Sequence, residues 1–521
     1  MTLPNGWVDA MVVDVVGINP ANPEVLPSDE TPVSFVPMAQ VEELSGHLDS
    51  STVRLWREVK KGYSRFQEGD VVVAKITPSM ENGKAAIARG LSKGIGAGTT
   101  EFHVLRPRGG IEAHYVLHYI LQESFRRSAR SRMTGTAGQL RVPAAFLEEQ
   151  QIPLAPQAEQ VRIVETIKSY LSRLDAAVAR LERAQTKLKA YRASVLKAAV
   201  EGRLVPTEAE LARREGRSYE PADVLLARIL KERRRRWEDA ELARMKAAGK
   251  SPTNDRWMAK YEQPMPPDTR ELPSLPEGWC WATVDQLSRA VFYGSSSKTE
   301  QSVDEAPRVV PVLRMGNIVD GVLDLSKLKF LPVEHEEFPE LLLESGDLLF
   351  NRTNSPELVG KTAIYKGSPS PCSFASYLIC VRFLSGVEPQ WIAYVINSPF
   401  GRQWIWSVVT QQVGQANVNG SKLKALAVPL PPAEEHRRCV STMDLLFSNA
   451  DVQQDVVGRQ LLRLARLRQA ILKWAFQGRL VDQDPADEPA DVLLARIRAE
   501  RAAVASDPAK KSRARGLQAA S

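Results

Sequence analysis

The sequence predicts an α+β fold that is built twice, with two mixed α/β domains separated by two long antiparallel coiled-coil helices. A tandem duplication would relate the two halves by a pseudo-two-fold axis. Three observations support this prediction. Segments recur at a nearly constant offset, short β-branched runs fill the first part of each half, and a heptad pattern follows in the second part.

The duplication is visible in five ordered matches, at offsets of 268 to 277 residues. The matching segments are 3–7 (LPNGW) with 275–279 (LPEGW), 66–88 with 343–365, 153–156 with 429–432, 194–205 with 470–481, and 220–229 with 488–497. The last pair is identical, EPADVLLARI in both copies. Ordered matches of this kind indicate a repeated unit about half the chain long.

The first part of each half, residues 1–150 and 273–428, mixes short β-branched runs with Gly, Pro and Asn. This composition is typical of mixed α/β domains with long functional loops. The remaining predicted boundaries are a first spacer helix at 151–205, a charged helical segment and Pro-rich linker at 206–272, a second spacer helix with a C-terminal helix at 429–505, and a disordered basic tail at 506–521.

Each predicted long helix carries an apolar seam with alternating spacings of three and four residues. The seam residues are Val164, Ile167, Leu171, Leu174, Val178, Leu181, Leu188 and Val195 in the first helix, and Val440, Met443, Phe447, Val457, Leu461, Leu464 and Ile471 in the second. Both helices follow a Pro-rich turn and end near a glycine, Gly202 or Gly478. A helix of roughly 44 residues would be about 65 Å long, so its seam needs a partner. We expect that partner to be the duplicate helix, running antiparallel.

Composition limits the class of protein without fixing its function. The chain has 521 residues, a formal charge of +7 and a pI near 9.1, which permits a polyanionic partner. Its longest apolar runs are shorter than a membrane span, and the N-terminal segment lacks the pattern of a signal peptide. The four cysteines form no CxxC pair, so we expect reduced thiols in a cytoplasmic protein. The basic run 231–237 could grip phosphate, although a solvated helix face is the favoured interpretation.

Catalytic and metal motifs are weak throughout. Residues 355–362 (SPELVGKT) end like a phosphate-binding loop but lack its first glycine, and 397–400 (NSPF) resemble only faintly a methyltransferase motif. His114 and His118 have a zinc-like spacing, yet no further ligands accompany them, and packing on a helix is favoured. The glycine-rich stretch 90–98 is interpreted as a turn. We therefore predict no catalytic site and no metal site in this chain.

The motifs together closely resemble the specificity subunit of type I restriction-modification systems. The residues that carry the resemblance are the two LPxGW openings, Gly69-Asp70 with 74–84 (AKITPSMENGK), 99–107 (TTEFHVLRP), 153–164 (PLAPQAEQVRIV) and the repeated LLARI. The resemblance covers nearly the whole chain. It departs from the family at Glu434-Glu435-His436, where Glu-Gln is expected, and in the second domain, which follows the consensus loosely.

The resemblance implies a non-catalytic subunit that reads DNA. Residues 1–150 and 273–428 would be target-recognition domains, each reading one half of a bipartite double-stranded site, with the helices setting their spacing. Two methyltransferase subunits using S-adenosylmethionine would dock for adenine-N6 methylation. Up to two restriction and translocation subunits using ATP and Mg would join for cleavage. No membrane partner and no cofactor of its own are implied.

The polar loops of both domains fit this role, because DNA reading needs cations for phosphates and amide or guanidinium groups for base edges. The candidate DNA-binding residues of the first domain are Lys75, Thr77, Ser79, Asn82 and Lys84, with Arg132, Thr134, Thr136, Gln139 and Arg141 in a later loop. Those of the second domain are Arg352, Thr353, Asn354 and Lys361, with Gln411, Gln412, Gln415, Asn417 and Asn419. The alternative is that they are turn residues that bond their own backbone.

Two other classes of function stay open. One is a self-contained DNA methyltransferase or nuclease, which the weak cofactor and metal motifs oppose. The other is a coiled-coil scaffold that binds no DNA. Salt-sensitive binding to duplex DNA would separate the scaffold from a DNA reader.

Overall fold

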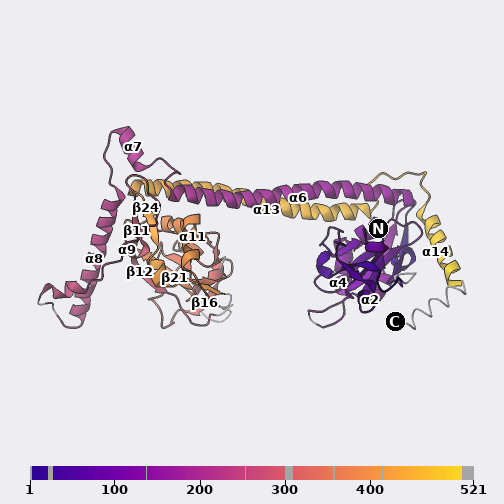
Figure 1. The fold of residues 1–521 in the computed structure, drawn as a ribbon, viewed down its shortest axis with the longest axis horizontal. Coiled ribbons are helices and arrows are strands. Elements are labelled where there is room, and N and C mark those ends of the chain that lie inside the picture. The colour runs from indigo at the N-terminus through magenta and orange to yellow at the C-terminus, as the bar shows by residue number, and fades with distance from the viewer. Residues whose placement is uncertain are drawn as a thin grey trace. The chain divides into compact units, whose positions relative to one another are not determined.

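The computed structural model describes residues 3–21, 27–136, 138–250, 252, 254–299, 309–355, 358–412 and 415–506, with the side chains of 354, 410–412, 415 and 504–506 left out. The chain forms two compact units (Figure 1). Unit 1 is Met1–Arg183 with Val457–Ser521, and unit 2 is Ala184–Val456. The predicted domain boundaries stay a prediction, and most of the predicted tail, residues 507–521, lies outside the described residues.

The described part of unit 1 contains two four-stranded sheets, with the strand orders β2-β9-β6-β7 and β4-β3-β8-β5, and a ladder of β1 with β10. The strands are β1 (Val8–Met11), β2 (Val16–Ile18), β3 (Pro32–Val36), β4 (Val53–Leu55), β5 (Ser64–Gln67), β6 (Val71–Ala74), β7 (Ala85–Ile87), β8 (Ile95–Gly98), β9 (Phe102–Pro107) and β10 (Gln151–Leu154). The short helices are α1 (Val12–Val15), η1 (Met38–Gln40), α2 (Trp56–Val59), η2 (Ser92–Gly94), α3 (Ala113–Ile120), α4 (Glu123–Ser131) and α5 (Ala144–Glu148).

The glycine-rich stretch 90–98 is only partly a turn, so its interpretation from the sequence was incomplete. Its second half is β8, an inner strand of the second sheet. A Cβ atom at Gly96 would lie 2.1 Å from the Phe66 ring, and one at Gly98 would lie 2.5 Å from the Val36 carbonyl oxygen. These glycines are therefore required by close packing within a strand.

Unit 2 repeats this plan within its described residues. The strand order of its main sheet is β12-β21-β17-β19, beside the sheets β16-β13-β20, β14-β15 and β18-β23-β22 and the ladder of β11 with β24. The strands are β11 (Cys280–Thr283), β12 (Ser288–Tyr293), β13 (Val309–Leu313), β14 (Ile318–Val319), β15 (Val322–Leu323), β16 (Lys329–Pro332), β17 (Leu348–Asn351), β18 (Thr353–Asn354), β19 (Thr362–Ile364), β20 (Ser373–Phe374), β21 (Leu378–Phe383), β22 (Thr410–Gln412), β23 (Gln415–Asn417) and β24 (Ala427–Leu430). The helices are α7 (Glu208–Glu215), α8 (Ala222–Ala247), η3 (Asp255–Lys260), α9 (Val284–Leu287), η4 (Met315–Asn317), α10 (Pro389–Asn397), α11 (Pro399–Val408) and α12 (Gly420–Lys424).

The repeated LPxGW motif makes the same contact in both units. The indole N–H of Trp7 donates to the Glu159 carboxylate at 3.0 Å, and that of Trp279 donates to Glu435 at 2.9 Å. Each of these tryptophans precedes the strand that pairs with the end of its own domain, β1 with β10 or β11 with β24. The motif therefore ties the start of each domain to the first turn of a long helix.

The long helices are α6 (Gln157–Val200, 44 residues) and α13 (Ala433–Ala475, 43 residues), and a third helix, α14 (Ala490–Ser506), follows α13. The lengths of α6 and α13 match the prediction. Both are followed by a glycine with positive φ, 66° at Gly202 and 63° at Gly478. The left-handed backbone at these glycines allows the next amide to cap the helix carbonyls, because glycine pays no Cβ penalty there.

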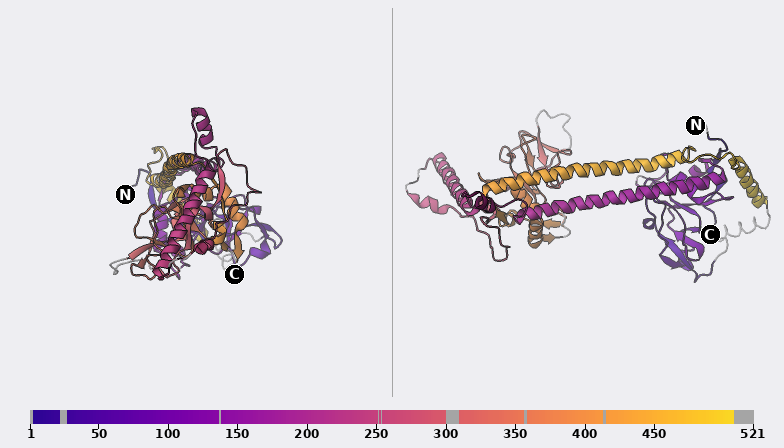
Figure 2. Two further views of the ribbon diagram at one scale, coloured as in Figure 1. Left: turned by 90° about the vertical axis from the view of Figure 1, so that its left-hand side faces the viewer. Right: turned by 90° about the horizontal axis from the view of Figure 1, so that it is seen from above.

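The antiparallel arrangement predicted for the helices is confirmed in each unit separately. In unit 1 the start of α6 packs with the end of α13, through Ile167 and Ile471, and in unit 2 the end of α6 packs with the start of α13, through Val195 and Met443. Figures 1 and 2 show α6 and α13 side by side. All of the seam residues named from the sequence are buried or half buried.

Two ion pairs between α6 and α13 repeat each other. Arg468 pairs with Asp175 in unit 1, and Arg192 pairs with Asp451 in unit 2. Arg192 and Asp175 on α6 correspond to Arg468 and Asp451 on α13 at the offset of 276. Each pair is thus the duplicate of the other, and each joins the two antiparallel helices within its own unit.

The basic run 231–237 lies on α8, where three of its four arginines pair with carboxylates on the same helix, while Arg233 pairs with Asp285 on α9 (Val284–Leu287). Arg235 and Arg236 bind Glu232, and Arg234 binds Glu238. These intrahelical pairs favour the interpretation as a solvated helix face. Among the described helices, none is long and apolar enough to cross a membrane.

Because His118 and His436 are buried, we expect each unit to lose stability as the pH falls. His118 on α3 and His436 on α13 each have a pKa lowered to about 3, because burial penalises the charged ring and neighbouring cations add to the effect. A histidine with a depressed folded pKa binds fewer protons than in the unfolded chain, so stability is lost as the pH falls below about 6.5.

Each of these two histidines should therefore lower the free energy of unfolding by about 2 kcal/mol between pH 6.5 and pH 5, at 1.36 kcal/mol per pH unit. Urea denaturation at the two pH values tests this, with His118→Leu flattening the pH dependence in unit 1. The matched control is His47→Leu, since His47 is exposed. Equal pH dependence of His118→Leu and the unsubstituted chain would contradict the expectation.

Candidate nucleic-acid interface

A Gly-Asp turn stands directly before β6 in unit 1 and before β17 in unit 2, and we call these two strands the central strands. Asp70 accepts hydrogen bonds from the Gln67 backbone amide at 2.8 Å and from Arg106 Nε at 2.8 Å, where Arg106 lies on β9. Asp347 repeats this with the Glu344 amide at 2.8 Å and Arg382 Nε at 3.0 Å, on β21. The preceding glycines have φ near +90°, 86° at Gly69 and 94° at Gly346. The motif therefore aligns each central strand with its neighbour.

The other end of the central strand carries the predicted polar loops, and the structure brings the two loops of each unit together. In unit 1 the Lys75 amide donates to the Glu101 carbonyl at 2.9 Å, and the Val142 amide donates to the Lys75 carbonyl at 2.8 Å. In unit 2 the equivalent bonds run from Arg352 to Tyr377 at 3.0 Å and from Val418 to Arg352 at 2.9 Å. We call this meeting point the loop junction, centred on Lys75 in unit 1 and Arg352 in unit 2.

The first loop of unit 1 is held largely by its own contacts. The Thr77 hydroxyl bonds Glu81 at 3.1 Å, the Asn82 amide donates to Glu43 at 2.8 Å, and the Lys84 amine donates to the Met38 carbonyl at 3.2 Å. Asn82 is exposed, while Lys75, Thr77, Ser79 and Lys84 are half buried. Because the Lys84 amine already donates to the Met38 carbonyl, a phosphate would have to compete with that carbonyl for the amine.

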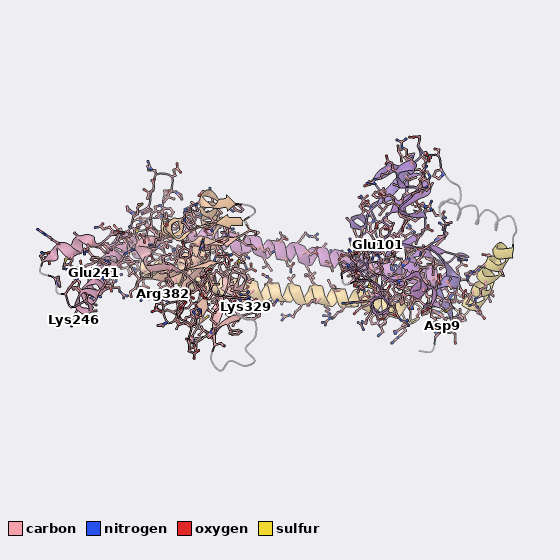
Figure 3. The ribbon with its side chains drawn as sticks, turned by 90° about the horizontal axis from the view of Figure 1, so that it is seen from below. Asp9, Glu101, Glu241, Lys246, Lys329 and Arg382 are labelled. Atoms are coloured by element: carbon pink, nitrogen blue, oxygen red, sulfur yellow. The ribbon has the colours of Figure 1, made fainter. Side chains whose placement is uncertain are left out.

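The second loop of unit 1 is open to solvent. Arg132, Thr134, Thr136 and Gln139 are exposed. Arg141 is held by Glu101, with Nε at 2.9 Å and Nη2 at 2.9 Å from its carboxylate oxygens. This ion pair lowers the pKa of Glu101 and raises that of Arg141. Figure 3 labels Glu101 among the side chains.

The junction of unit 2 carries different groups on the same backbone. The Arg352 guanidinium lies 4.8 Å from the centre of the Tyr293 ring, and the Asn417 amide donates to the Thr353 hydroxyl at 3.1 Å. Lys361 is half buried, and Asn419 is exposed and caps α12 by accepting the Lys422 amide at 2.9 Å. The side chains of Asn354, Gln411, Gln412 and Gln415 lie outside the described residues, although their backbones form strands β18, β22 and β23. A DNA-contacting role for the nineteen candidate residues stays a prediction.

Three residues at the junctions were missed from the sequence. They are Glu101 in unit 1 and Tyr293 and Tyr377 in unit 2, of which Tyr293 is 42% and Tyr377 is 54% exposed. Glu101 and Tyr377 are equivalent at the offset of 276. The signal that could have found Glu101 and Tyr377 is this offset, applied to positions near the polar loops; the offset does not point to Tyr293, whose counterpart is Gly17.

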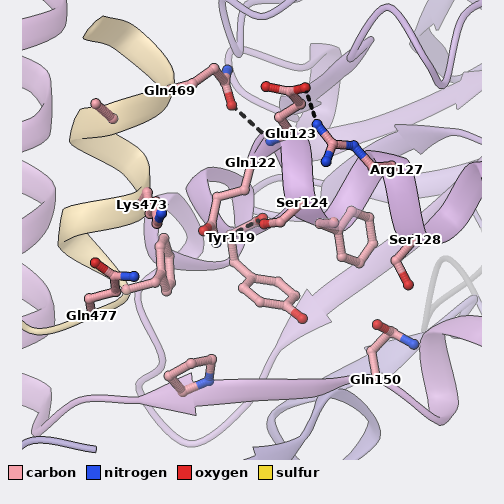
Figure 4. Close-up of a pocket in the computed structure, with 14 residues that line it drawn as sticks. Tyr119, Gln122, Glu123, Ser124, Arg127, Ser128, Gln150, Gln469, Lys473 and Gln477 are labelled. Carbon is pink, nitrogen blue, oxygen red and sulfur yellow. Dashed lines mark hydrogen bonds and ion pairs between the residues drawn. The ribbon is translucent and has the colours of Figure 1, made fainter. Parts of the chain in front are cut away.

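Unit 1 also contains an open cavity of about 620 Å³ beside α4 and the end of α13 (Figure 4). Its lining includes Tyr119, Glu123 and Lys473, and the Glu123 amide donates to Gln469 at 2.7 Å. None of the candidate DNA-binding residues lines it. Among the described residues, no group of three or more His, Cys, Asp or Glu side chains is placed to hold a metal ion.

The chain is similar in sequence to known proteins. No family model matches the chain. The chain is 29% identical over 497 residues to the EcoAI specificity subunit of a type I restriction enzyme from Escherichia coli, covering 86% of this chain and 79% of that protein. It is 26% identical over 531 residues to the EcoKI specificity subunit from Escherichia coli strain K12, covering 98% and 99% of the two chains.

A solved structure is similar in fold. It is a chain from work on complex assembly and conformational transition of the type I R-M system, with a TM-score of 0.63 and 18% sequence identity. The match covers 92% of this chain and 100% of that one. At this identity the likeness concerns the fold, which is mixed α and β with two long helices in the chain described above.

Proposed function

We propose that this chain, which belongs to the specificity subunits of type I restriction-modification systems, reads a bipartite double-stranded DNA site. Each target-recognition domain reads one half of the site, for adenine-N6 methylation or restriction by partner subunits. The observation that carries the proposal is the loop junction, which occurs once in each unit with the same backbone hydrogen bonds and different polar side chains. Two readers of different sequences require this combination of a shared frame and unlike contacts.

The charges and loop chemistry support DNA as the ligand. The chain is basic, with a formal charge of +7, and the exposed part of the later loop in unit 1 carries Arg132, Thr134, Thr136 and Gln139. Arginine and glutamine donate to base edges or phosphates, and threonine hydroxyls commonly bond phosphate oxygens. Binding should therefore weaken steeply with salt, which a scaffold without a nucleic-acid role would not show.

The partners in this proposal are two methyltransferase subunits and up to two restriction subunits. The long helices expose large apolar side chains, including Leu445 and Leu462, each 63% exposed, and Val452, which is 56% exposed. Exposed apolar groups of this kind favour docking of further protein. The chain itself is proposed to be non-catalytic, with S-adenosylmethionine held by the methyltransferase partner and ATP and Mg by the restriction partner.

Exchange of one recognition domain tests the proposal. Replacing residues 1–150 with the first domain of another family member should change one half-site and leave the other half-site and the spacer unchanged. Methylation-aware sequencing of cells that express the chimera with its methyltransferase subunits measures both halves at once.

The reciprocal exchange of residues 273–428 is the matched control and should change only the other half. Simultaneous loss of both half-sites in either chimera, with the complex still assembled, would contradict two independent readers. Methylation by the purified chain alone would instead favour the self-contained methyltransferase.

A further inference from the structure

We infer that Glu101 positions Arg141 to read a guanine in the first half-site, and that the equivalent pair, Tyr377 and Asn417, gives the second half-site a different preference. The inference rests on the proposed function and deepens it. Glu101 and Tyr377 lie outside the polar loops, so the inference adds one position in each domain to those that determine specificity.

The backbone around these positions is the same in the two units. Arg141 forms one antiparallel bridge with Ile76 and another with Thr134. The equivalent bridges in unit 2 join Asn417 with Thr353 and Asn417 with Thr410. Next to these bridges, the carbonyl of Glu101 accepts the Lys75 amide in unit 1. In unit 2 the carbonyl of Tyr377 accepts the Arg352 amide in the same way. Because the frame is shared, the side chains alone distinguish the two junctions.

Arg141 is held in a defined orientation with part of its guanidinium free. Its Nε and Nη2 atoms bond the Glu101 carboxylate, and Nη1 donates to the Gln139 carbonyl at 3.1 Å. Each Nη atom carries two hydrogens, so one donor on each remains for an outside acceptor. Arginine reads guanine through two N–H donors, which bind the O6 and N7 acceptors in the major groove.

Glu101 contributes by restricting Arg141 before DNA arrives. An arginine in water samples many rotamers, and the entropy lost on binding is smaller when the side chain is already fixed. The Arg141 side chain is 41% exposed and that of Glu101 is 22% exposed, so the carboxylate is the more buried partner and the guanidinium stays accessible. Glu101 is therefore a positioning residue, and Arg141 is the group that touches the base.

Unit 2 cannot form this clamp, because both of its members are replaced. Tyr377 has no carboxylate, and it presents a ring that is 54% exposed. Asn417 is half buried and uses its amide N–H on Thr353. An aromatic ring and an amide in the same frame suit apolar contact with a thymine methyl group or hydrogen bonding to adenine better than guanine. The second domain should therefore lack a guanine preference at this position.

The test uses the full chain in complex with its methyltransferase subunits and a pool of duplexes with randomised half-sites, sequenced after selection at moderate salt. Arg141→Gln should lower the preference for guanine at one position of the first half-site by about tenfold or more. Glu101→Gln should lower the guanine preference less than Arg141→Gln does, and Glu101→Asp, which keeps a carboxylate, should lower it less again. All three should leave the second half-site unchanged. The control is Glu30→Gln, which removes an exposed ion pair with Arg57 elsewhere in unit 1 and should leave both half-sites unchanged.

A transplant gives the stronger test and does not depend on the folding of the unit 1 variants. Tyr377→Glu combined with Asn417→Arg should introduce a guanine preference at the corresponding position of the second half-site. Specific binding by the original chain with unchanged preferences in Arg141→Gln and in the transplant would overturn this inference and leave the proposed function standing. Absence of any sequence preference in the original complex would overturn both.

Discussion

Deleting one heptad from each long helix, residues 181–187 of α6 and 457–463 of α13, is expected to give a folded chain that no longer recognises its original bipartite site. The two deleted segments are equivalent at the offset of 276. Seven residues are two turns of a coiled-coil seam, so the apolar stripe stays continuous on both helices. The deletion therefore shortens the helices without turning their seams away from each other.

The ion pairs explain why the two deletions must be made together. Asp175 pairs with Arg468 in unit 1 and Arg192 pairs with Asp451 in unit 2, and along the sequence the deleted heptads lie between these residues on both helices. Removing seven residues from both strands of the pair leaves each arginine opposite its own aspartate. Removing them from one helix would shift one pair relative to the other and leave a cation and a carboxylate without their partners.

The effect on DNA follows from the lengths. Seven helical residues span about 10 Å, at roughly 1.5 Å per residue. That is about three base pairs at roughly 3.4 Å each, over which the groove turns by about 100°. If the helices set the distance between the two readers, the second domain no longer meets its groove at the original site. A remaining site should keep both half-sequences with a shorter spacer.

Methylation-aware sequencing of cells that carry the shortened chain and its methyltransferase subunits measures the spacer directly. Deletion of five residues from each helix is the control, because five residues rotate the seam and should destabilise the helix pair. An unchanged spacer with full methylation in the seven-residue deletion would show that another part of the complex sets the distance.

The helices and the duplication could be predicted because they depend on patterns local in sequence. The heptad spacing of Val164, Ile167 and Leu171 needs only the helical period, and the glycines that follow the helices need only the geometry of a helix end. LPxGW could be recognised as a repeated motif, but its hydrogen bond to a glutamate about 150 residues away could not. A repeat shows that a segment is used twice without showing what it contacts.

The loop junctions were predicted only in part, for the same physical reason. The sequence pointed to polar loops, yet the pairing of Arg141 with Glu101 depends on where two segments 40 residues apart meet. Local spacing carries no information on that meeting. The glycines of β8 were misread in the same way, since the Phe66 ring that requires Gly96 lies on another strand. Contacts between strands, not periodicity, determine these positions.

The buried Asp347 should be among the most costly side chains to remove from unit 2. Asp347 is 2% exposed and accepts hydrogen bonds from the Glu344 amide and from Arg382, whose side chain is 14% exposed. Asp347→Ala would leave a largely buried guanidinium and a backbone amide without this acceptor. Breaking a buried pair by removing one partner costs about 3 kcal/mol or more. Arg382 retains an ion pair with the more exposed Glu344 at 3.0 Å, which should keep the loss near that lower value.

Urea denaturation combined with hydrogen exchange in the two units should show this loss in unit 2 alone. Asp70→Ala should produce a similar loss in unit 1, because Asp70 makes the same contacts with Gln67 and Arg106. The control is Asp268→Ala, which removes an exposed ion pair with Arg270 and should leave stability nearly unchanged, because solvent screens exposed pairs. If Asp347→Ala and Asp268→Ala were equally mild, the Gly-Asp turn would not be what aligns β17 with β21. Its recurrence in both halves would then need an explanation outside stability.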